Sequence, residues 1–71
     1  MQVERLGKLL EADLNNAAPN DRAVTIHLFG IRYAKEIGSG ATQIAVAAGI
    51  SPKYGTELRK GMKIAKFVVL K

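Results

Sequence analysis

The hydrophobic residues recur at helical spacing in the first segment of the chain. In residues 3–17 they lie three or four positions apart, at Val3, Leu6, Leu10, Leu14 and Ala17. This spacing places them on one face of an amphipathic helix. The sequence Pro-Asn-Asp at residues 19–21 interrupts the pattern, and Asn20 or Asp21 is a suitable N-cap for a second helix.

The second segment, residues 22–37, carries two neighbouring apolar stripes. One consists of Ala23, Ile26, Gly30, Tyr33 and Ile37, and the other of Val24, Leu28 and Ile31. A helix that is apolar over so much of its circumference is expected in the middle of a bundle. The alternation of Val24, Ile26 and Leu28 also fits a short strand, so that alternative stays open. Gly38 can adopt the left-handed conformation that ends a helix.

Two further helices are predicted in the second half of the chain, over residues 41–48 and 52–64. Gly49 breaks the first of them, while Ser51 and Pro52 suit the cap and the first residue of the next.

The C-terminal helix and the tail that follows it complete the predicted fold. The helix has its apolar seam at Leu58, Met62 and Ala65, and Gly61 either stops it or allows another helix to approach closely. Residues 66–70 are β-prone and predict one short strand, which either pairs with its copy in a dimer or caps the core. The expected fold class is mainly α, with four helices and a short C-terminal β-strand.

The composition narrows the class of protein. A chain of 71 residues is one domain, here residues 1–71, and it has no cysteine for a disulfide or a cysteine-ligated metal site. No apolar run approaches the ~18 residues of a membrane span, and the charged N-terminus does not resemble a signal peptide. We therefore expect a cytoplasmic protein with no membrane, cofactor or metal partner.

The net charge of +5 comes entirely from the C-terminal part of the chain. Charges cancel in residues 1–50, whereas residues 51–71 carry six basic residues against a single acidic one, Glu57. A basic excess confined to one segment favours a polyanionic partner such as nucleic acid. A solvated basic face that serves solubility is the alternative interpretation.

The stretch IAVAAGIS at residues 44–51 has the residue types that a tight turn between two helices requires. Ala45 is small enough for a second helix to approach closely, and Gly49, four positions later, tolerates a positive φ. Ile50 can fill the core behind the turn, and Ser51 can cap the helix that follows.

This stretch resembles the core of the helix-turn-helix superfamily of DNA-binding proteins. The resemblance covers residues 41–60 and implies a four-helix domain whose helix-turn-helix unit spans about residues 41–64. The helices with a terminal strand are similar to tri-helical and winged-helix variants, and the stretch IHLFGIRYAKEIGSG is similar to small bacterial helix-turn-helix-like proteins. The implied function is DNA binding by a transcriptional regulator.

One residue departs from the pattern of the superfamily. Gly55 stands where an apolar side chain is usual, in the first half of the second helix. We expect this glycine to weaken the packing, at a cost of about 1 kcal/mol relative to alanine, and Tyr54 to fill the space.

By the same resemblance, the helix that starts at Pro52 enters the major groove with its N-terminal turn. The implied DNA-binding residues are Ser51, Lys53, Tyr54, Thr56, Glu57, Arg59, Lys60, Lys63 and Lys66. Lys53 suits a guanine or a phosphate and Thr56 suits a thymine methyl, whereas the basic residues farther along suit phosphates. The partner that the resemblance implies is double-stranded DNA.

Some of these residues also have simpler structural interpretations. Ser51 is first a helix cap, and Tyr54 is equally a packing residue. Glu57 would be repelled by phosphate. It can accept a hydrogen bond from cytosine, or it can pair instead with Lys53 or Lys60 on its own helix.

Other classes of function have weaker support in the sequence. His27 is the one histidine and is expected to be a hydrogen-bonded structural residue, so no acid–base or metal constellation indicates an enzyme. The four aromatic residues form no stacking platform for RNA. The alternative function is a protein–protein interaction module built on a helix-turn-helix-like scaffold. Helix 3–17 or strand 66–70 would supply the interface of a homodimer, which would read two half-sites ~34–36 Å apart.

Overall fold

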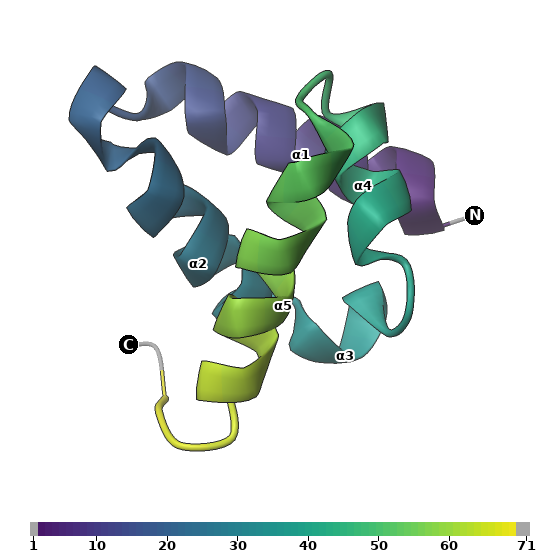
Figure 1. Ribbon diagram of the computed structural model, residues 1–71, viewed down its shortest axis with the longest axis vertical. Coiled ribbons are helices and arrows are strands. Elements are labelled where there is room, and N and C mark those ends of the chain that lie inside the picture. The colour runs from purple at the N-terminus through teal and green to yellow at the C-terminus, as the bar shows by residue number, and fades with distance from the viewer. Residues whose placement is uncertain (1, 70–71) are drawn as a thin grey trace.

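Five α-helices follow one another in residues 2–69, the part of the chain that the computed structural model describes (Figure 1). Their bounds are α1 Gln2–Asn16, α2 Arg22–Arg32, α3 Ala34–Ile37, α4 Ala41–Ala47 and α5 Gly55–Ile64. Single 3₁₀ turns precede α2, at Pro19–Asp21, and α5, at Pro52–Tyr54. α1 packs on α4, α2 packs on α5, and α4 lies against the start of α5.

The core draws on all five helices. Its fully or almost fully buried apolar residues are Leu6, Leu10, Leu14, Ile26, Phe29, Ile37, Ala41, Ile44, Ala45, Ala48 and Leu58. The apolar face predicted for residues 3–17 is therefore directed inward, with Val3 partly buried at its start. Most of this face is packed within the chain, whereas Val3 and Leu9 of α1 stay partly exposed.

The predicted C-terminal strand is wrong for the residues that the structure describes. Residues 65–67 form a turn after α5, and Val68 and Val69 have no regular structure. Leu70, the last residue of the predicted strand, lies outside the described part of the chain. Residues 2–69 contain no strand at all, so the β-prone tail has no strand to pair with within them.

The single helix predicted over residues 22–37 is two helices, so that the described chain has five helices and not four. Tyr33 separates them, with φ −111° and ψ 22°. Its ring packs against Phe29 with the centroids 4.6 Å apart, and α3 then carries Ile37 into the core. Neither glycine nor proline marks this break, which explains why the hydrophobic pattern did not reveal it.

The environment of α2 also differs from the prediction. Its first apolar stripe reaches the core through Ile26 and Gly30, but Val24 and Leu28 of the second stripe are exposed. With so few helices in the chain, α2 is covered on one side only and lies at the edge of the bundle.

α2 and α5 come into backbone contact where two glycines face each other. A Cβ atom on Gly61 would overlap the carbonyl oxygen of His27, and one on Gly30 would overlap that of Leu58. Gly61 therefore does not stop α5; it allows α2 to approach closely, which was one of the two roles predicted for it. This contact fixes α5 across the front of the molecule in Figure 1.

Candidate nucleic-acid interface

The turn between α4 and α5 has the conformation that its sequence predicted. Gly49 has φ +81°, and the N–H groups of Gly49 and Ile50 donate to the carbonyls of Val46 (3.0 Å) and Ala45 (3.1 Å). These two bonds satisfy the last carbonyls of α4 in the Schellman pattern. Ala45 is fully buried and Ile50 packs against the core, so both occupy the positions expected of them.

The start of the second helix is capped as predicted, but it is a 3₁₀ turn before it becomes α5. The Ser51 side-chain oxygen accepts a hydrogen bond from the Lys53 N–H at 3.4 Å, and Pro52 occupies the first position of the turn. Tyr54 is half-buried and packs against the core. Ser51 and Tyr54 therefore both have structural roles that hold α5 in place.

The structure reverses the expectation that Gly55 weakens the packing. Gly55 is buried at the first position of α5, and a Cβ atom there would lie 2.8 Å from the Thr42 Oγ1 and 3.0 Å from the Thr42 Cα. An apolar side chain would push α5 away from α4. The glycine thus permits a closer crossing of the two helices, and the angle of the hairpin depends on it.

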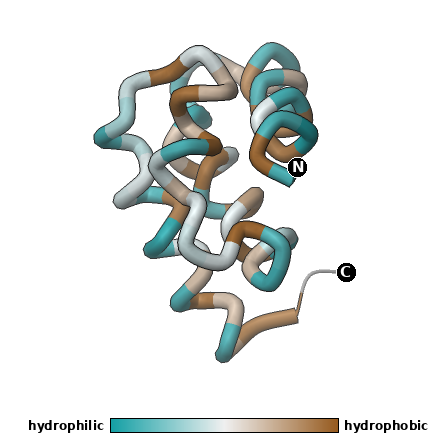
Figure 2. The backbone as a smooth tube through the Cα atoms, turned by 90° about the vertical axis from the view of Figure 1, so that its right-hand side faces the viewer, coloured by the Kyte–Doolittle hydropathy of each residue, from teal (hydrophilic) through white to brown (hydrophobic). Residues whose placement is uncertain are grey.

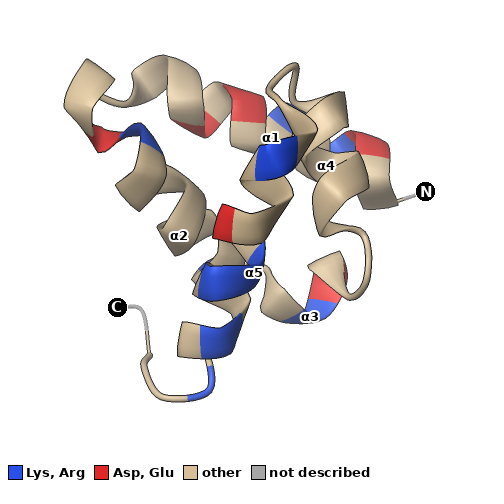
Figure 3. Ribbon diagram, viewed as in Figure 1, with Lys and Arg blue, Asp and Glu red and all other residues tan. Residues whose placement is uncertain are grey.

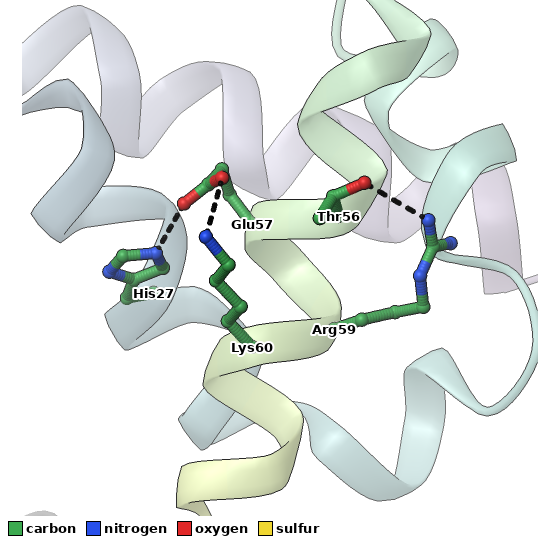
Figure 4. Close-up of polar contacts among 5 residues, drawn as sticks. All are labelled: His27, Thr56, Glu57, Arg59 and Lys60. Carbon is green, nitrogen blue, oxygen red and sulfur yellow. Dashed lines mark hydrogen bonds and ion pairs between the residues drawn. The ribbon is translucent and has the colours of Figure 1, made fainter.

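Glu57 faces α2 along one edge of α5 (Figure 4). One carboxylate oxygen lies 2.7 Å from the His27 Nε2 and the other lies 3.4 Å from the Lys60 Nζ. Because an ionised carboxylate only accepts hydrogen bonds, the His27 Nε2 donates. The hydrogen bond from His27 is the main reason why the pKa of Glu57 is lowered. Desolvation raises this pKa in part, and the hydrogen bond and charge of Lys60 lower it further.

Arg59 lies along the opposite edge of α5 and reaches toward α4. Its guanidinium donates to the hydroxyl of Thr56 at 3.3 Å (Figure 4) and to that of Thr42, also at 3.3 Å. Both acceptors are neutral, so the positive charge of Arg59 is held in position and is not cancelled.

The remaining predicted cations are exposed along α5 and the start of the tail. Lys53, Lys63 and Lys66 have no ion pair with any residue of the described range 2–69, and only Lys60 is paired, with Glu57. Figure 3 shows the basic residues following α5 down to the tail, whereas α1 carries both acidic and basic residues. The structure thus brings Lys53, Thr56, Arg59, Lys60, Lys63 and Lys66 together on one exposed surface, which we call the α5 basic face.

The sequence patterns identified neither His27 as the partner of Glu57 nor Thr42 as a partner of Arg59. His27 was predicted to be a hydrogen-bonded structural histidine, which is confirmed, but its partner is 30 positions away along the chain. Thr42 is 17 positions from Arg59. Helical periodicity compares residues within one helix, so it carries no signal for pairs such as these.

Two helices joined by a tight glycine turn, with the second helix exposed and basic, define a helix-turn-helix protein. The chain belongs to the family of helix-turn-helix-like domains, whose sequence model matches residues 2–71. This membership points to a DNA-binding protein and confirms the predicted superfamily. Comparisons with curated proteins and with solved structures gave no match. No helix in residues 2–69 is both long enough and apolar enough to cross a membrane.

Proposed function

We propose that the protein binds double-stranded DNA by placing α5 in the major groove, and that it acts as a transcriptional regulator. The observation that carries the proposal is the α5 basic face, which is exposed and mostly unpaired on a helix-turn-helix scaffold. A helix with its side chains is about 10–12 Å across, and the major groove is about 12 Å wide.

The residues of the face divide by position. Lys53 and Thr56, in the first turns of the second helix, would contact base edges, and Arg59, Lys60, Lys63 and Lys66 would contact phosphates. Ser51 and Tyr54 position the helix. Glu57 also acts as a positioning residue, because its carboxylate is held by His27 and Lys60 and is turned from the groove.

The experiment is fluorescence anisotropy of labelled duplex DNA over a range of salt concentrations. Four phosphate contacts, or five if Lys53 also binds a phosphate, predict that log K falls with log salt at a slope of about −3.6 to −4.5. The double variant Lys53→Ala/Lys60→Ala should bind more weakly and with a shallower slope.

The matched control is Arg5→Ala/Lys8→Ala, which removes the same charge from exposed positions on α1. It should bind like the wild type. Equal affinity of wild type and the α5 variant, or no wild-type binding at low salt, would rule out the proposed interface.

A second candidate function, a protein-interaction module, is favoured by the tail. Phe67 is 84% exposed and Val69 is 90% exposed, and Figure 2 shows this hydrophobic segment running out from the end of α5. We propose that a second copy covers it, which would give a homodimer with half-sites ~34–36 Å apart. Sedimentation should detect a dimer that Phe67→Ser dissociates. A wild-type monomer at high concentration would contradict the homodimer, and no binding of duplex DNA even at low salt would favour a protein partner.

A further inference from the structure

A groove of about 600 Å³ lies between α3 and the C-terminal half of α5. Four cations line it: Lys35 from α3, and Arg59, Lys63 and Lys66 from α5 and the turn after it. Its remaining lining consists of Gly38 and the apolar residues Ala34, Met62 and Ala65. The lining therefore combines cationic and apolar side chains, and one side of the groove is the Arg59 edge of the α5 basic face.

The positive charge of this groove is not balanced within the described chain. No Asp or Glu among residues 2–69 lines it, and none of its four cations has an ion pair there. Arg59 contacts only neutral hydroxyls. Closely spaced like charges repel one another, so an anionic occupant would be bound favourably.

We infer that this groove binds the sugar–phosphate backbone of one DNA strand, with Lys35 as a phosphate contact outside the helix-turn-helix unit. The inference rests on the proposed function and extends its interface to α3. A helix that fills the major groove brings the two backbones to its two edges. The strand along the Arg59 edge would then lie over this groove.

The composition of the groove matches this occupant. A DNA strand alternates charged phosphates with deoxyribose, whose carbon–hydrogen surface suits the apolar residues of this lining. The cations supply the phosphate contacts, which fix position and carry no sequence information. Lys35 is exposed, and it is the only cation of the groove that α3 contributes.

The test is the salt dependence of duplex binding by Lys35→Ala, compared with Lys8→Ala as a control that removes the same charge from α1. Loss of one phosphate contact should reduce the magnitude of the slope by about 0.9. Affinity should fall by a similar factor for duplexes of different sequence, because a phosphate contact does not select bases. Lys35→Ala/Lys66→Ala should reduce the slope by about 1.8.

Lys8→Ala should leave the slope unchanged, and circular dichroism of each variant confirms that the fold is kept. If the wild type binds DNA and Lys35→Ala keeps its slope and affinity, the groove is not a backbone site, although the α5 interface stands. If the wild type binds no duplex, both the groove and the proposed function are overturned.

Discussion

At the scale of single residues, Glu57 decides how the basic face is presented. It is the one acidic residue of α5, and a free carboxylate in the middle of that face would repel DNA. His27 on α2 holds it at 2.7 Å instead, and Lys60 holds its second oxygen. The same carboxylate therefore links α2 to α5 and is directed to one edge of the helix.

This arrangement predicts a pH dependence of stability. The pKa of Glu57 lies below its ordinary value of 4.5 in the folded protein, chiefly because His27 donates to it. The resulting stabilisation is complete above the unfolded-state pKa and is lost as the pH falls through the folded-state pKa.

The variant Glu57→Gln should therefore have a smaller free energy of unfolding than the wild type at neutral pH, and the difference should shrink below pH 4.5. Urea titrations of both proteins at neutral and acidic pH measure it. A difference that stays constant with pH would mean that the charge of Glu57 contributes nothing to the link.

At this scale the sequence predicted single positions within the turn well. Ala45, Gly49, Ile50 and Ser51 each have the role inferred for them, because a tight turn imposes local steric and capping requirements. The sequence could not predict the hydrogen bond between His27 and Glu57, since these residues are 30 positions apart and only tertiary packing brings their helices together.

At the scale of elements, the position of α5 depends on close helix crossings. Gly55 allows its first residue to approach α4, and Gly61 allows its later half to approach α2. Both glycines reduce the intrinsic helix propensity of α5. The close packing offsets this cost, and the outer residues of the second helix stay exposed.

Because these effects are opposed, the sign of the stability change in Gly61→Ala shows which of them dominates. Propensity alone predicts that alanine stabilises α5 by about 1 kcal/mol. The overlap of its Cβ with the His27 backbone predicts instead a loss of roughly 1–3 kcal/mol, because the backbone cannot move aside without separating the helices. Chemical denaturation distinguishes the two, and a stabilised variant would contradict the close crossing of α2 and α5.

Helical segments were easier to predict than their limits or the tail. The periodicity of residues 3–17 and the turn signals around Gly49 identified real helices. The break at Tyr33 has no local signal and arises from packing. The tail has strand propensity, but a strand also needs a partner, and local sequence does not say whether one is near.

At the scale of the whole molecule, charge is distributed unevenly over the helices. The excess of basic residues lies along α5 and the groove beside α3, whereas α1 carries acidic and basic residues together (Figure 3). Such a distribution steers a polyanion toward one face and makes the rate of association depend on salt. The C-terminal excess of charge was evident from the sequence, but the contribution of Lys35 was not, because it comes from a segment with no net charge.

The most direct test of the DNA-binding interface is an NMR titration of the ¹⁵N-labelled protein with duplex DNA. We predict that the backbone amides of Lys53–Lys66 and of Lys35 shift, and that those of the exposed α1 residues Glu4, Lys8 and Glu11 do not. Shifts on α1 with none on α5, or no shifts at low salt, would contradict the assignment of α5 as the DNA-binding helix.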